Sequence, residues 1–69
     1  SYQHARTKII EHLVSIEKYN EAIEKSNEFL RINPRRDHIE KTYFYMGQAY
    51  YELKNFPKAR KFYNKVIKI

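Results

Sequence analysis

The sequence of 69 residues contains no cysteine, no tryptophan, a single glycine and two prolines. Without cysteine the chain has no disulfide scaffold, no thiolate metal site and no cysteine nucleophile. A single glycine also excludes a glycine-rich loop that would cradle the phosphates of a nucleotide. No run of 18 apolar residues and no signal-like segment occurs, so we expect nothing in this sequence to cross a membrane.

The length limits how the chain can be organised. Sixty-nine residues suffice for one small domain but not for two hydrophobic cores. A domain of this size hides roughly 60% of its unfolded surface, so its free energy of unfolding should be about a few kcal/mol. Both ends fall inside segments of helical character. We therefore expect residues 1–69 to form a single domain that is a fragment of a longer chain.

The positive charge is confined to the second half of the sequence. The net charge is +6, but five bases and five acids balance each other up to Pro34. Nine bases and three acids follow, and after Glu52 there are six bases and no acid. This asymmetry favours long-range attraction to acidic partners without indicating a particular ligand.

Apolar residues recur at helical spacing in four segments, and no strand-like alternation is left. The second helix is expected to end before Pro34 and the third near Leu53. The residues that carry the pattern in the first, second and fourth segments are Ile9, Ile10, Leu13, Val14 and Ile16; Tyr19, Ala22, Ile23, Phe29 and Leu30; and Ala59, Phe62, Tyr63, Val66 and Ile67.

Turn and capping residues separate these segments. Pro34 stops the second helix, because a residue before proline avoids the helical conformation. Asp37 is predicted to cap the third helix, with Glu40 reaching back to complete a capping box. Pro57 is expected in the first turn of the fourth helix, where its missing N–H is not needed. Short turns between four helices predict two consecutive antiparallel helix pairs.

The chain contains an internal repeat of 37 residues. Aligning Tyr19 with Phe56 also places Ala22 on Ala59 and Leu13 on Tyr50. Apolar, aromatic and small positions mostly coincide, which divides the chain into repeat one at about 3–36 and repeat two at about 37–69. A period in this range indicates an array of helical repeats.

Repeat two resembles the tetratricopeptide repeat family. The residues that carry this resemblance are Tyr43, Met46, Gly47, Tyr50, Ala59 and Tyr63. Gly47 and Ala59 would remove side chains where the two helices approach, and the larger residues would fill the surrounding space. Repeat one keeps Ala22 and Pro34 but has Arg6, Ile10 and Ser26 in place of an aromatic residue, the glycine and a second aromatic residue. The resemblance implies an all-α fold of two antiparallel helix-turn-helix hairpins, stacked as a short right-handed superhelical array.

The family's usual period is 34 residues, and the surplus is expected in a lengthened connection over residues 34–40. This feature is similar to tetratricopeptide proteins of the bacterial envelope, such as BamD-type outer-membrane assembly lipoproteins and the coordinator of the Tol–Pal system. Mitochondrial fission adaptors with two such repeats are similar to a lesser degree. The sequence leaves the compartment open between the cytoplasm and, if the envelope resemblance holds, a periplasmic or membrane-associated location.

The resemblance also implies a groove lined by the first helix of each repeat, in which a partner peptide or helix binds. The expected groove residues are Thr7, Glu11, Lys41, Phe44, Gln48 and Tyr51, with His4, Val14, Ser15 and Glu52 beside them. Rigid aromatic side chains such as Phe44 and Tyr51 suit the anchoring of a peptide. The alternative is that Phe44 and Tyr51 pack on the neighbouring helix of repeat one. Family members that grip chaperone C-termini use lysine and asparagine where this chain has Thr7, Glu11 and Tyr45, so that ligand is not expected.

A second surface candidate is a basic patch on the fourth helix. Its members share one helix face at i, i+3, i+7 and i+10, and are Lys58, Lys61, Lys65 and Lys68. They could contact nucleic acid, an anionic membrane or an acidic protein, or they could form a solvated face that maintains solubility. The aromatic residues between them follow the helix period into the core, so nucleic acid is the less expected partner.

The remaining residues indicate no catalytic chemistry. The three histidines His4, His12 and His38 are not spaced as metal ligands, and the glutamates of the second helix form a solvated face rather than a catalytic pair. We expect no enzyme activity, no cofactor and no metal.

The apolar face of the last helix, Phe62, Val66 and Ile69, is expected to be covered by a second copy or by residues beyond this sequence. The sequence thus predicts a non-catalytic protein-interaction module, with electrostatic binding through the fourth helix as the alternative.

Overall fold

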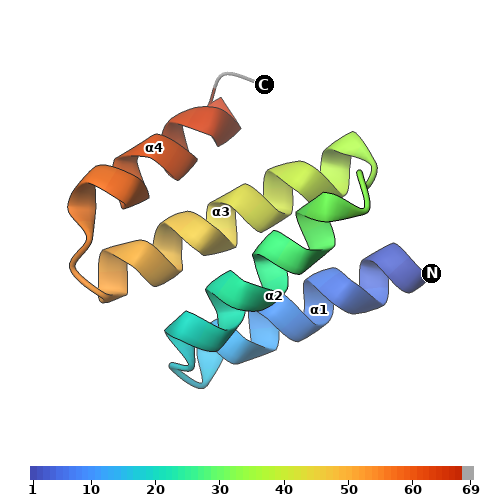
Figure 1. Cartoon of the computed structure of the whole chain (residues 1–69), viewed down its shortest axis with the longest axis horizontal. Helices are drawn as coiled ribbons and strands as arrows, with labels where there is room; N and C mark the ends of the chain where they lie inside the picture. Colours follow the sequence, from blue (N-terminus) through green and yellow to red (C-terminus); the bar gives the residue numbers. More distant parts are fainter. Residues whose placement is uncertain (68–69) are drawn as a thin grey trace.

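A computed structural model describes residues 1–67, and Figure 1 shows their path as four helices joined by short connections. The helices are α1 (Tyr2–Ser15), α2 (Tyr19–Arg31), α3 (Arg36–Glu52) and α4 (Phe56–Ile67). No strand occurs in this part of the chain, which confirms the predicted all-α class. Helix α3 lies in the middle of the molecule, because it packs on α1 and α2 on one side and on α4 on the other.

Helix α1 buries a narrower stripe than its apolar pattern suggests. Its N-terminus is capped by Ser1, whose hydroxyl accepts from the backbone N–H of His4 at 3.3 Å. Ile10 and Leu13 are buried, but Ile9 and Ile16 are 47% and 45% exposed. Two of the five apolar positions that define the helix in the sequence therefore face solvent, and a hydrophobic period alone does not distinguish them from the core.

The connections α1–α2 and α3–α4 have the same conformation in both repeats. Glu17 and Lys54, 37 residues apart, have positive φ values of 63° and 64°. The amide N–H of the residue after each donates to a carbonyl of the preceding helix, Lys18 to Leu13 and Asn55 to Tyr50, at 2.8 Å in both cases. This left-handed ending of a helix usually uses glycine, which this chain lacks at both places. The same backbone geometry at positions 37 residues apart supports the internal repeat inferred from the sequence.

The connection α2–α3 differs from its prediction in two respects. Helix α3 begins at Arg36, so most of residues 34–40 form its first turn rather than a lengthened joint. The expected cap at Asp37 is wrong as well: Arg35 is the capping residue, and its side chain makes no capping bond. The backbone N–H of Arg35 instead donates to the side-chain amide oxygen of Gln3 at 2.9 Å, which ties the connection to α1. Asp37 lies inside the first turn, where a carboxylate interacts favourably with the helix dipole.

The core consists of residues from all four helices. Its buried apolar members are Ile10, Leu13, Ala22, Phe29, Met46, Ala49 and Ala59. Helix α4 begins as predicted, with Pro57 in its first turn, and the side-chain oxygen of Asn55 accepts from the Lys58 N–H at 3.4 Å. No helix among residues 1–67 has the length and apolar character needed to span a bilayer.

Candidate partner-binding groove

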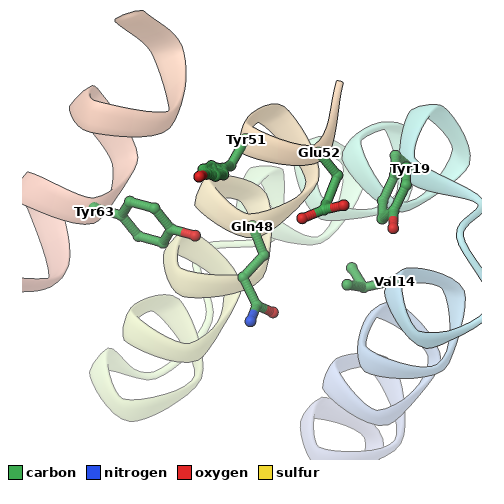
Figure 2. A pocket seen from close by; sticks show the side chains of 6 residues that line it. All are labelled: Val14, Tyr19, Gln48, Tyr51, Glu52 and Tyr63. Atoms are coloured by element: carbon green, nitrogen blue, oxygen red, sulfur yellow. The ribbon is translucent and has the colours of Figure 1, made fainter. Parts of the chain in front are cut away.

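The only glycine of the chain determines where one groove residue lies. Gly47 is buried in α3, and a Cβ atom built on it would be 2.6 Å from two ring carbons of Tyr63. The Tyr63 ring therefore packs directly on the backbone of α3, as the resemblance implied for this pair of positions. The ring of Phe44 lies 6.1 Å from that of Tyr63, centroid to centroid. Tyr63 is thus held between two positions of α3, and its hydroxyl reaches toward an open cavity (Figure 2).

This cavity, which we call the groove cavity, has a volume of about 250 Å³ and is lined by side chains from all four helices. Its lining residues are Val14, Tyr19, Gln48, Tyr51, Glu52 and Tyr63. Figure 2 shows these six side chains around one opening, with three phenol rings, one amide and one carboxylate. The combination of apolar ring faces with a few polar groups is typical of a site that orients a ligand.

The groove cavity contains two of the six expected contact residues, Gln48 and Tyr51, together with Val14 and Glu52 from the wider set. Tyr51 and Phe44 are 48% and 43% exposed, so neither is a core residue. Phe44 lies outside the cavity and contacts Tyr63 from the side.

The other expected contact residues do not line the groove cavity. Thr7 is buried, and its hydroxyl donates to the carbonyl of His4 at 2.8 Å. Lys41 is exposed on α3, and Glu11 lies on α1. His4 and Ser15 are also exposed outside the cavity.

Glu11 joins the two repeats through a hydrogen bond. The Tyr45 hydroxyl donates to its carboxylate at 2.5 Å, and the Lys8 ammonium lies 3.2 Å from the same group. Hydrogen bonds from Tyr45 and Lys8, followed by the charge of Lys8, lower the pKa of Glu11 below its ordinary value. Burial, then the bond to Glu11, raises the pKa of Tyr45 to about 12. The carboxylate is therefore engaged within the protein, which makes it less available to a partner.

Tyr45→Phe is expected to lower the melting temperature at pH 7 and to do so less at pH 3. Because the folded state lowers the pKa of Glu11, its contribution to stability is present above the unfolded pKa and is lost as pH falls through the folded one. Thermal unfolding followed by circular dichroism at both pH values tests this. Tyr50→Phe is the control, since the structure gives the Tyr50 hydroxyl no hydrogen bond among residues 1–67. Equal losses for Tyr45→Phe at pH 7 and pH 3 would contradict the role of the charged bond.

Tyr19 and Tyr63 were expected among the packed residues, but their outer ends also line the groove cavity. Burial, followed by the negative charge of Glu52, raises the pKa of both tyrosines above the ordinary value. The carboxylate of Glu52 is thus close enough to influence phenols on α2 and α4. The sequence does carry one indication that these two residues line a cavity. Both are tyrosine rather than phenylalanine, and a half-buried phenol directs its hydroxyl to a polar opening.

The basic patch lies over aromatic rings. The ammonium groups of Lys58, Lys61 and Lys65 are 5.3, 5.6 and 5.3 Å from the ring centroids of Tyr50, Phe62 and Tyr43, respectively. Phe62 stacks on Tyr50 at 5.6 Å with an interplanar angle of 13°, so the three rings form a continuous support. The fourth expected member, Lys68, lies outside the described residues. None of the three lysines lines the groove cavity.

The apolar end of α4 is only partly covered. Phe62 and Val66 are half-buried, and Ile67 is 79% exposed. Ile69, the third residue expected in a self-association surface, lies outside the described residues. Among residues 1–67 no three histidine, aspartate or glutamate side chains gather in a way that could hold a metal ion.

Comparison with known families gives a match to the tetratricopeptide repeat. The model of the tetratricopeptide repeat matches residues 40–69, the segment that contains most of α3 and all of α4. No curated protein and no solved structure matches the chain. Proteins of this family generally mediate protein–protein interactions and are generally not catalysts. Residues 40–69 are thus similar to a tetratricopeptide repeat, and the four helices, packed as consecutive antiparallel pairs, are consistent with a tetratricopeptide-like fold.

Proposed function

We propose that this chain is a non-catalytic scaffold or adaptor module that binds a partner peptide or helix through the groove cavity and the adjoining exposed face of α3. The observation that carries the proposal is the cavity of about 250 Å³ lined by side chains from all four helices. Its aromatic rings offer contact area at small entropic cost, and its amide and carboxylate offer orienting hydrogen bonds. Phe44 and Lys41 lie on α3 beside the cavity, where they would contact a ligand longer than the cavity itself.

The proposal predicts that groove variants lose peptide binding while keeping the fold. A library of random octapeptides is selected on the wild-type domain, and the bound peptides are titrated against Gln48→Ala/Tyr51→Ala. Because central aromatic contacts dominate binding energy, we expect affinity to fall by about tenfold or more. Both side chains are at least partly exposed, so the melting temperature should change little.

Ile9→Ala is the matched control for this experiment. Ile9 is 47% exposed, close to the 48% of Tyr51, but it lies on α1 outside the groove cavity. The control should bind the selected peptides as the wild type does. Peptides that bind Gln48→Ala/Tyr51→Ala as tightly as the wild type would contradict the groove proposal.

The basic patch supports a second candidate function, the binding of nucleic acid or an anionic membrane. Its supporting observation is that aromatic rings hold three ammonium groups on one surface at 5.3–5.6 Å. Ligands bound there through phosphates should lose affinity many-fold between roughly 50 and 200 mM salt. Binding in the groove cavity should change little over the same range, so repeating the titrations at both concentrations distinguishes the two.

The 37-residue spacing also motivates a narrower proposal, that the chain comes from a tetratricopeptide protein of the bacterial envelope. The sequence of the gene upstream of the codon for residue 1 tests it. A lipidation cysteine there would support this placement, and a cytosolic enzyme domain fused at that end would contradict it.

A further inference from the structure

We propose that the groove cavity selects a partner peptide by a basic side chain, and that the carboxylate of Glu52 receives the lysine or arginine of that peptide among the rings of Tyr19, Tyr51 and Tyr63. This inference rests on the proposed function, because it names the chemistry of the ligand that the groove would bind. It also separates the partner from the acidic ligands that the net charge of +6 would otherwise suggest.

The walls of the groove cavity suit a cation. Phenols from α2, α3 and α4 line it, and the Tyr63 hydroxyl is directed toward the opening (Figure 2). A phenol oxygen accepts hydrogen bonds from an ammonium or guanidinium group, and an aromatic ring attracts such a cation within about 6 Å of its centre. The same molecule already holds three lysines over rings at 5.3–5.6 Å. A volume of about 250 Å³ lies below the roughly 300–1,000 Å³ of pockets for drug-sized ligands, so it fits one side chain better than a cofactor.

The charge in the groove cavity is negative, and no base among residues 1–67 forms an ion pair with it. Among residues 1–67, Glu52 is the only charged residue that lines the cavity. Among residues 1–67, no lysine, arginine or histidine nitrogen lies within 4.0 Å of its carboxylate. Glu11, the other carboxylate near this face, is already bonded to Lys8 and Tyr45. Glu52 is therefore available to an external cation, and Glu11 is not.

The position of Glu52 does not serve the stability of its helix. It is the last residue of α3, and α3 has no basic residue in its last turn. A negative charge at the C-terminal end of a helix interacts unfavourably with the helix dipole. The two phenols whose pKa Glu52 raises are neutral near pH 7, so they supply no positive charge to offset it. A binding role accounts for an acidic residue at a place that helix energetics disfavour.

The test uses four octapeptide libraries that differ only at a fixed central position: lysine, arginine, norleucine or glutamate. Norleucine keeps the aliphatic chain of lysine without its charge. On the wild-type domain at constant salt, the lysine and arginine libraries should bind about tenfold more tightly than the norleucine library. On Glu52→Gln this preference should fall to less than about threefold, while the melting temperature stays the same or rises because the unfavourable charge is removed.

Glu24→Gln is the matched control, since it removes the same charge from an exposed position on α2 that is outside the cavity and forms no ion pair with residues 1–67. It should keep the preference of the wild type. An equal loss of preference in Glu24→Gln would overturn the inference, because it would show a general effect of net charge.

Two further outcomes separate this inference from the proposed function. Peptides that lose binding to Gln48→Ala/Tyr51→Ala but show no preference for lysine or arginine would overturn the inference and leave the groove function standing. Peptides whose binding is unaffected by Gln48→Ala/Tyr51→Ala would overturn both. A preference that persists in Glu52→Gln would overturn the assignment of the carboxylate.

Discussion

Gly47→Ile is expected to destabilise the domain by about 2–3 kcal/mol. The new Cβ atom alone would lie 2.6 Å from two carbons of the Tyr63 ring, and further carbons follow it. Overpacking of this kind typically costs about 1–3 kcal/mol. The better helix propensity of isoleucine offsets only part of that cost. In a domain of this size the melting temperature should fall by roughly 10–20 °C, which thermal unfolding followed by circular dichroism would measure.

Repeat one provides the control for this prediction. At the 37-residue offset, Ile10 and Ser26 correspond to Gly47 and Tyr63, and both are 1% exposed. Repeat one thus has its large residue, Ile10, on the first helix and its small residue, Ser26, on the second. Repeat two has the opposite arrangement. Gly47→Ile/Tyr63→Ser copies that arrangement and should be at least about 1 kcal/mol more stable than the sum of its single variants predicts. Additive effects would contradict the proposed exchange of volumes between the repeats.

Phe29→Ala is expected to leave most molecules unfolded near room temperature. Phe29 is 0% exposed on α2, and the guanidinium of Arg6 lies 5.9 Å from its ring centroid. Truncation of a buried phenylalanine typically costs about 3–5 kcal/mol. That is comparable to the whole free energy of unfolding of so small a domain. The helical signal in circular dichroism should drop, and the cooperative thermal transition should disappear.

A milder variant keeps this prediction testable. Phe29→Leu retains most of the buried volume and should fold, with a loss of about 1–1.5 kcal/mol. Ile9→Ala removes an apolar side chain from the surface and should change the stability by about 0.5 kcal/mol or less. A Phe29→Ala domain as stable as Ile9→Ala would show that Phe29 is not the centre of the core.

The sequence was sufficient to predict the four helices, because each has an apolar period, Pro34 stops the second helix and Pro57 suits the first turn of the fourth. Prediction from the sequence was wrong where a tertiary contact, rather than a local pattern, decides the structure. The cap of α3 is Arg35 rather than the predicted Asp37, and the amide of Arg35 donates to Gln3, 32 residues away. No local pattern reports a bond of that separation. Likewise, Ile9 and Ile10 are equally apolar, and only the packing of α1 decides that Ile10 is buried.

The site was predictable only in part, for a related reason. The register of α3 predicts Phe44, Gln48 and Tyr51 on one face, because residues three and four apart share a side of a helix. Gln48 and Tyr51 line the cavity with Glu52, and Phe44 does not. The contributions of Tyr19 and Tyr63 depend on how α2 and α4 meet α3. The close approach at Gly47, which the family pattern did indicate, is what brings Tyr63 to the cavity. Combining the glycine with the choice of tyrosine at 63 would have revealed this residue.

The most direct test of the account is a nuclear magnetic resonance footprint of a selected octapeptide on the labelled domain. The account predicts the largest chemical-shift changes at the side-chain amide of Gln48, the methyl groups of Val14 and the ring of Tyr51. It also predicts unchanged signals for the ammonium groups of Lys58 and Lys61 on α4. Changes confined to those lysines, with Val14 and Gln48 unaffected, would contradict the groove and place the binding surface on the basic patch.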